Sequence, residues 1–145
     1  MNIRKVAVVS ILCVVVAISA FLIYLFRLEA QENLKNHFSV SIEKVDYYNF
    51  QWASYPIGGA YVSGCDVNLT ICIHSNLESD ANVTFNVTIL RLWKRNEYKA
   101  ERYITETVFV QALQNKNVTV TASMPDNSGD NHYSAEILDV QELAR

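Results

Sequence analysis

A run of 21 residues without a charged side chain, residues 6–26, constrains this chain more than any other feature. It reads VAVVSILCVVVAISAFLIYLF and follows the basic residues Arg4 and Lys5. As a helix at about 1.5 Å per residue it spans roughly 30 Å, the thickness of the hydrocarbon core of a bilayer. Because lipid offers the backbone no hydrogen-bonding partner, such a segment is helical there despite its many β-branched residues. We predict a transmembrane helix at residues 6–26, with the lipid bilayer as its partner.

A cleaved signal peptide is the alternative interpretation of this run. The apolar region of a signal peptide is typically about 7–15 residues long and is followed by small residues at the cleavage site. Ala17 and Ser19 would form only a poor site, and cleavage there would leave the apolar residues 21–26 on the mature protein. The length of the run therefore favours a retained anchor.

The flanking charges predict the orientation of this anchor. Arg4 and Lys5 precede the run, whereas Arg27 is followed closely by Glu29 and Glu32. Positive charge concentrates on the cytoplasmic side, so we predict a cytoplasmic tail at residues 1–5 and an extracytoplasmic domain at residues 38–145. Between them, residues 27–37 contain helix formers and no Gly or Pro, which predicts a helical stalk.

Beyond residue 37 apolar and polar side chains alternate, as is typical of half-buried strands. The alternation predicts strands at residues 38–42, 60–63, 65–73, 82–89, 100–110, 117–123 and 133–140. Turn residues separate them, including residues 55–59 and Ser63-Gly64. The alternation slips near Leu90 and Leu92, which indicates a bulge. The fold class expected is mostly β: an N-terminal transmembrane helix plus a seven-stranded antiparallel immunoglobulin-like β-sandwich.

Four N-x-[ST] sequons lie in these predicted strands. In each, the alternation places the asparagine on the face opposite the apolar residues, where a glycan could be attached in an exported domain. Chance alone also produces such motifs in strands that are rich in Asn and Thr. The glycosylation candidates are Asn68, Asn82, Asn86 and Asn117.

Three cysteines are present, and a disulfide between Cys65 and Cys72 would suit an exported domain. In one continuous strand, however, their Cα atoms would lie roughly 23 Å apart, far beyond the ~7 Å limit for a bridge. Their seven-residue separation also puts them on opposite faces of that strand. We favour two unbridged thiols, with Cys13 as a small filler in the apolar helix.

Residues 28–145 carry a net charge of −6, which excludes the basic surface expected of a nucleic-acid-binding protein. One basic cluster interleaved with aromatic residues is a possible contact patch for an acidic partner, glycan or lipid headgroup. The alternative is a solvated hairpin tip, which the neighbouring Glu97 and Glu101 favour. The patch comprises Arg91, Trp93, Lys94, Arg95, Tyr98, Lys99 and Arg102.

No enzyme signature is present in the sequence. The histidines His37, His74 and His132 are isolated, without the spacing typical of zinc ligands, so we expect surface positions for them. No clustered acid, base or nucleophile is evident, and no G-x-S-x-G motif occurs. We therefore predict no catalysis, no metal and no cofactor.

The membrane helix, short stalk and small β-domain together resemble the membrane-anchored immunoglobulin-like domains of prokaryotic, especially archaeal, cell envelopes. The strand at residues 67–73, its Asn/Ser loop and the late Thr-rich strand at 117–123 are also similar in layout to water-stress-type domains. The resemblance implies a binding or scaffold module with an envelope protein or glycan as partner. A pilin-like filament subunit, with the apolar helix in the filament core, is the alternative.

Overall fold

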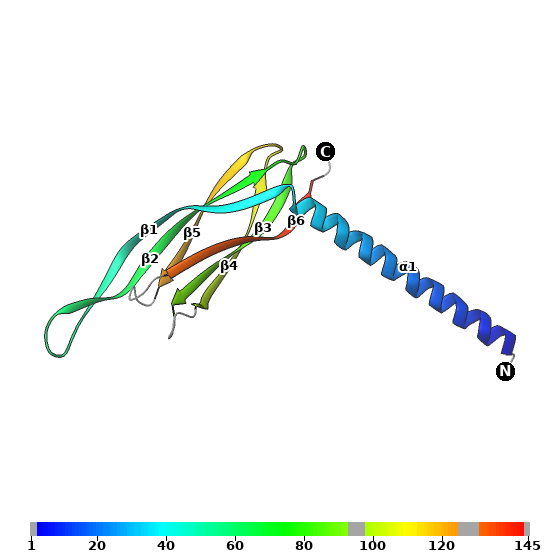
Figure 1. The fold of residues 1–145 in the computed structure, drawn as a ribbon, viewed down its shortest axis with the longest axis horizontal. Helices are drawn as coiled ribbons and strands as arrows, with labels where there is room; N and C mark the ends of the chain where they lie inside the picture. Colours follow the sequence, from blue (N-terminus) through cyan, green and yellow to red (C-terminus); the bar gives the residue numbers. More distant parts are fainter. Residues whose placement is uncertain (1–2, 93–97, 125–130, 144–145) are drawn as a thin grey trace.

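The protein consists of one long helix joined to a two-layered β-sandwich (Figure 1). The computed structural model describes residues 3–92, 98–124 and 131–143, and side chains for residues 12–91, 102–124 and 131–143. The elements are α1 (Ile3–Lys35), β1 (Phe38–Ser54), β2 (Ala60–Ser75), β3 (Ala81–Leu92), β4 (Tyr98–Val110), β5 (Asn115–Met124) and β6 (Asn131–Glu142).

The six strands form two antiparallel three-stranded sheets, in the orders β1-β2-β5 and β4-β3-β6. The predicted count of seven strands is therefore wrong in the described part of the chain. Residues 60–63 and 65–73 belong to one strand, because Gly64 makes no turn. A Cβ at Gly64 would lie 3.2 Å from both the Gln51 side chain and the Met124 carbonyl oxygen, so glycine permits close packing inside the sheet.

The apolar faces of the two sheets pack together, and the phase of the predicted alternation is confirmed. Inward residues of the central strands β2 and β3 are fully buried, including Leu69, Ile71 and Phe85. On β5, Val120 and Ala122 are buried as well. The bulge expected near Leu90 is present as a register shift between Ile89 and Leu90 against β4.

Strands β1 and β2 are the longest, and together they form a hairpin that extends past the rest of the sandwich (Figure 1). β5 pairs with β2 only from Cys65 onward, so residues 60–64 have β1 as their only described strand neighbour. Three irregularities interrupt the pairing of β1 and β2, at Glu43, at residues 49–50 and at Ser63. These bulges break the period-two pattern, which explains why the second half of β1 was not predicted.

The helix continues without a break from the apolar run into the stalk, and only residues 36 and 37 separate its end from the start of β1. Its end contacts the sandwich: Leu34 packs against the core, and the Gln31 Nε2 donates a hydrogen bond to Asp139 Oδ1 at 3.3 Å. In the described residues, 12–35 are long and apolar enough to cross a membrane, with mean hydropathy 2.1. A signal sequence passes the same test of length and composition. The fold therefore shows an N-terminal apolar helix, which is compatible with either an anchor or a signal sequence.

A tyrosine pair joins the two sheets along one side of the sandwich. Tyr47 on β1 and Tyr133 on β6 share a hydrogen bond of 2.7 Å between their hydroxyl groups. Burial, followed by this bond, raises the pKa of Tyr133 above its ordinary value. The pair therefore links the edge strands of the two layers.

Candidate functional site

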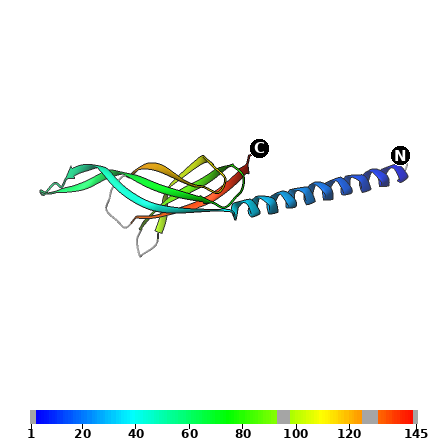
Figure 2. The ribbon, with the colours of Figure 1, turned by 90° about the horizontal axis from the view of Figure 1, so that it is seen from above.

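The free end of the β1–β2 hairpin is the most distinctive surface of the molecule. We call residues 47–64 the arm; it lies at the opposite end of the molecule from α1, and in both views it lengthens the body (Figures 1 and 2). A turn closes it, in which the Tyr55 N–H donates to the Gly59 carbonyl at 3.0 Å. Gly58 and Gly59 both adopt φ = 93°, a conformation that glycine accepts without strain.

The arm carries aromatic side chains and no charge. Residues 47–64 contain no Asp, Glu, Lys or Arg, but they hold six of the sixteen aromatic residues of the chain. Trp52 is 67% exposed and Ile57 is 97% exposed. The rings of Tyr55 and Tyr61 contact each other, with centroids 4.7 Å apart. Large exposed aromatic side chains gathered in one place are typical of an interaction surface.

Hydrogen bonds fix the base of the arm to the sandwich. Asp66 on β2 accepts one bond from Ser123 Oγ at 2.6 Å and one from Asn49 Nδ2 at 2.9 Å. Asn49 has φ = 50°, which the bulge at residues 49–50 requires. These two bonds, Ser123 first, hold the pKa of Asp66 below its ordinary value. The arm thus leaves the sandwich from a charge-assisted junction of three strands.

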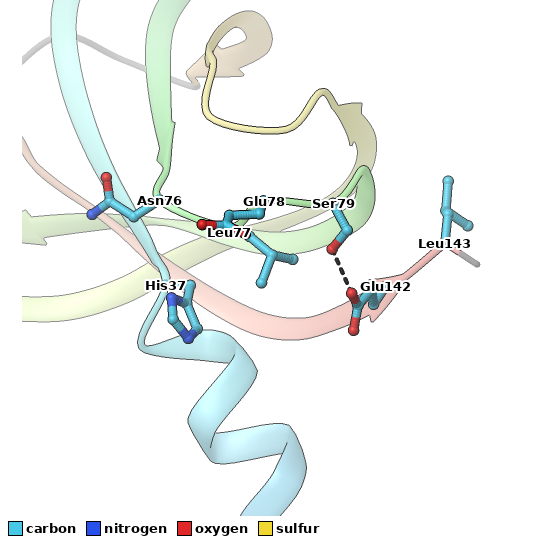
Figure 3. A pocket seen from close by; sticks show the side chains of 7 residues that line it. All are labelled: His37, Asn76, Leu77, Glu78, Ser79, Glu142 and Leu143. Atoms are coloured by element: carbon cyan, nitrogen blue, oxygen red, sulfur yellow. Dashed lines mark hydrogen bonds between the residues drawn. The ribbon is translucent and has the colours of Figure 1, made fainter. Parts of the chain in front are cut away.

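A pocket of about 600 Å³ lies where the helix end meets the loops of the sandwich (Figure 3). The Ser79 hydroxyl donates a hydrogen bond to the Glu142 carboxylate, and the His37 carbonyl accepts one from the Asn76 N–H at 2.9 Å. These bonds tie the loop after β2 to the helix end and to β6, which is a structural role. The lining residues are His37, Asn76, Leu77, Glu78, Ser79, Glu142 and Leu143.

The two cysteines of the sandwich are not bridged, as predicted from their spacing. Cys65 lies in the core, whereas Cys72 lies on the outer face of the β1-β2-β5 sheet and is nevertheless buried. Burial, together with the Glu43 carboxylate that accepts a hydrogen bond from the thiol, raises the pKa of Cys72. His74 lies two residues further along the same face. Its placement beside Cys72 and Glu43 corrects the expectation that it is isolated.

The four sequon asparagines all lie on the face opposite the core, but their exposure differs. Asn117 is exposed, and Asn68 and Asn82 are half-buried. Asn86 is only 6% exposed, so the expectation that it faces solvent is wrong. It lies on the central strand of its sheet, where polar side chains of β4 and β6 cover it. Alternation gives the face of a strand, but it does not show what the neighbouring strands place over that face.

The basic patch is only partly described. Trp93, Lys94 and Arg95 lie outside the described residues, and of Tyr98 and Lys99 only the backbone is described. The remaining members lie on neighbouring strands: Arg91 on β3 and the exposed Arg102 on β4.

Comparisons with known proteins assign no family. No family model and no curated protein matches the chain. A Northeast Structural Genomics Consortium target is 17% identical and has a TM-score of 0.43, with 77% of this chain and 89% of that chain covered. The alkylpurine DNA glycosylase AlkC of Pseudomonas fluorescens, bound to DNA with an abasic-site analogue, is 12% identical and has a TM-score of 0.38, with 68% of this chain and 29% of that chain covered. The putative ApaA protein of Bordetella pertussis is 9% identical and has a TM-score of 0.33, with 73% of this chain and 91% of that chain covered. At this identity and TM-score, the similarities carry no inference about ligand or activity.

Proposed function

We propose that the chain is a single-pass membrane protein whose extracytoplasmic β-sandwich serves as a binding or scaffold module of the cell envelope, without catalysis. Residues 6–26 are the anchor, residues 1–5 are cytoplasmic, and the sandwich is an immunoglobulin-like domain of the archaeal-type envelope class. The observation that carries the proposal is the arm: an uncharged, aromatic surface at the end of the molecule farthest from the anchor.

The chemistry of the arm fits a protein partner. Trp and Tyr offer large contact areas and are enriched at the energetic centres of protein interfaces. The second half of β1 also has β2 as its only described strand neighbour, so its outer backbone N–H and C=O groups can pair with a strand of a partner. The absence of charge between residues 47 and 64 removes the desolvation cost that buried ions would impose.

Exchange of arm residues tests this function. We expect a chemical crosslinker added to intact cells to join the wild-type chain to a partner protein, and the double variant Trp52→Ser, Tyr55→Ser to lose this crosslinked species. The matched control is Tyr103→Ser, because Tyr103 on β4 is 68% exposed, like Trp52, but lies outside the arm. A species that survives in the double variant would overturn the assignment to the arm. A crosslinked species that glycosidase removes would point to a glycan instead. Binding of the purified chain to protein-free vesicles, in place of a crosslinked protein, would point to a lipid.

The topology is tested separately. Protease added to intact cells should digest the sandwich and leave an anchor fragment of roughly 3 kDa, as the positive-inside rule implies. Protection of the sandwich until the membrane is lysed would reverse the proposed orientation.

A pilin-like subunit is the second candidate, and the continuity of α1 favours it. The helix runs from Ile3 to Lys35 without a break and projects from the sandwich with its apolar side chains exposed. Amino-terminal sequencing of the mature protein distinguishes the candidates. An intact start that includes Arg4 and Lys5 supports the anchor, whereas a trimmed start together with sedimentable filaments supports the pilin-like subunit.

A further inference from the structure

Three potential metal ligands converge on the outer face of the β1-β2-β5 sheet. Cys72 and His74 lie on β2 and Glu43 lies on β1, and one ligand atom of each lies within 4.8 Å of the other two. Cys72 faces Ser41 across the β1 ladder and Asn117 across the β5 ladder, and His74 faces Ser39 and Asn115. In these two rows of the sheet, therefore, the flanking side chains are small or neutral.

A β-bulge supplies the third ligand. Ile42 pairs with Ile71 and Lys44 pairs with Thr70, so Glu43 is an extra residue in β1. A bulge of this type places two successive side chains on the same side of the strand and re-aims them, and bulges are over-represented next to functional sites. In its absence, the period of two would make Glu43 face directly across from Thr70, a row further from His74.

The donor set has the chemistry of a zinc site. A thiolate, an imidazole and a carboxylate are the three ligand types that Zn²⁺ takes in proteins, at about 2.3, 2.0 and 2.0–2.2 Å. In tetrahedral geometry these bond lengths place the ligand atoms about 3.5 Å apart. The three ligand atoms lie within 4.8 Å of one another, and side-chain rotation of the exposed Glu43 and the half-buried His74 can bring them to this spacing.

The charges also fit. A thiolate and a carboxylate together neutralise a divalent cation, and no net charge then remains in the sheet surface. Lys44, the cation nearest along the chain, forms an ion pair with Asp46 at 2.7 Å. Cys72 is 3% exposed, so the metal would approach the sulfur from the side of Glu43 and His74, where solvent enters.

We propose that Glu43, Cys72 and His74 form a binding site for Zn²⁺, or a divalent cation of similar softness, with a fourth position left to water. Binding replaces the thiol proton, which is released to solvent. The site joins β1 to β2 within the part of the hairpin that belongs to the sandwich, and Glu43 lies four residues before the arm begins at Tyr47.

Co²⁺ is the probe, because its complexes with thiolate are coloured and Zn²⁺ is silent. The full chain in detergent micelles, carrying Cys13→Ser to remove the thiol of the apolar helix, should bind one Co²⁺. We expect a thiolate-to-cobalt charge-transfer band and the visible bands of tetrahedral Co²⁺, both abolished by equimolar Zn²⁺. Cys72→Ser should remove the charge-transfer band, and His74→Gln and Glu43→Gln should each weaken binding at least about 10-fold.

Two controls separate metal ligation from structural damage. His37→Gln changes a histidine outside the cluster and should leave the affinity within twofold of the parent. Saturating Zn²⁺ should raise the Tm of the parent chain but not that of His74→Gln, since a ligand that binds only the folded state stabilises it. Because His74 and Glu43 are not buried, their variants keep the test valid even if Cys72→Ser fails to fold. Cobalt bands that persist in both of those variants, or no bands in the parent chain, would overturn the proposal.

Discussion

Asn86 lies at the centre of the outer face of β3, and its neighbours make it a structural residue. Its amide contacts a threonine on its own strand, Thr105 on β4 and Glu136 on β6, at 3.2 to 3.5 Å. A glycan is attached through Nδ2, which donates to the threonine and to Glu136, so it would displace at least one of these two contacts. We therefore expect Asn86 to remain unmodified even in a host that glycosylates the exposed Asn117.

Removal of this amide should destabilise the domain. We expect Asn86→Ala to lower the free energy of unfolding by about 1–2 kcal/mol, because polar groups on both neighbouring strands lose a partner. Asn117→Ala, at an exposed position of β5, should change it by less than about 0.5 kcal/mol. Urea denaturation of the two variants measures the difference. Equal effects would show that the amide contacts of Asn86 contribute nothing.

Asp66 makes the domain sensitive to acid. A carboxylate whose pKa is lowered by folding contributes stability above its ordinary pKa of 3.8, and this contribution is lost as the pH falls below that value. Since Ser123 is the main cause, Ser123→Ala should raise the pKa of Asp66 towards 3.8. An NMR titration of the carboxyl carbon measures it. Thr119→Ala, on the same strand but away from Asp66, should leave the pKa unchanged; an unchanged pKa in Ser123→Ala would refute the assignment.

The side chains that alternation can place were predicted correctly, and those placed by other strands were not. Leu69, Ile71 and Phe85 were assigned to the core from their spacing, since period two is a local property of a strand. The Glu43–Cys72–His74 cluster needs a bulge and the β1–β2 register, neither of which is written in a local pattern. The one signal for it in the sequence is Cys-x-His, two ligands on the same face of one strand.

Among the elements, the predicted strands failed where pairing depends on irregularity. Residues 43–54 contain aromatic residues typical of strands, but bulges at Glu43 and at residues 49–50 disrupt their alternation. Gly64 was interpreted as a turn because glycine often interrupts a strand. In the structure, its missing side chain instead allows Gln51 and the Met124 backbone to pack closely against β2. The turn at residues 55–59 was predicted correctly, because Pro and two glycines together leave few other conformations.

Removal of the Tyr47–Tyr133 hydrogen bond should lower the free energy of unfolding, because this bond joins the two sheets. We expect Tyr133→Phe to cost about 1 kcal/mol of unfolding free energy at pH 7, the usual net value of one hydrogen bond. Because folding raises the pKa of Tyr133, this group contributes fully below the ordinary tyrosine value near 10 and loses its contribution above it. The wild-type domain should therefore lose more stability than Tyr133→Phe between pH 9 and about 11. Chemical denaturation at both pH values tests this, with the exposed Tyr103→Phe as control.

Considered as a whole, the molecule separates into an exposed apolar helix and a sandwich with a core of its own. The sandwich has its own core, so residues 28–145 should fold without the apolar helix as a soluble β-rich monomer. Residues 38–145 should fold too, but with an unfolding free energy lower by about 1–2 kcal/mol because Leu34 no longer covers the core.

Circular dichroism and urea denaturation of the two fragments check this prediction. Leu34→Ala in residues 28–145 should reproduce most of the loss seen on truncation. A helical far-UV spectrum, or a fragment that dissolves only together with the apolar helix, would contradict it.

The direct passage from helix to arm gives the chain a mechanical property. β1 begins three residues after α1 ends and runs to the tip. If the arm binds a partner and the helix is anchored in a bilayer, as proposed, tension between the two would travel along this one strand. That strand is already extended at about 3.3 Å per residue and can lengthen little, which spares the other five strands from the load. Residues 27–35 of the helix rise only about 1.5 Å per residue and would stretch first, by roughly 17 Å in all. Under tension, residues 27–35 would therefore unfold and lengthen before the sandwich unfolds.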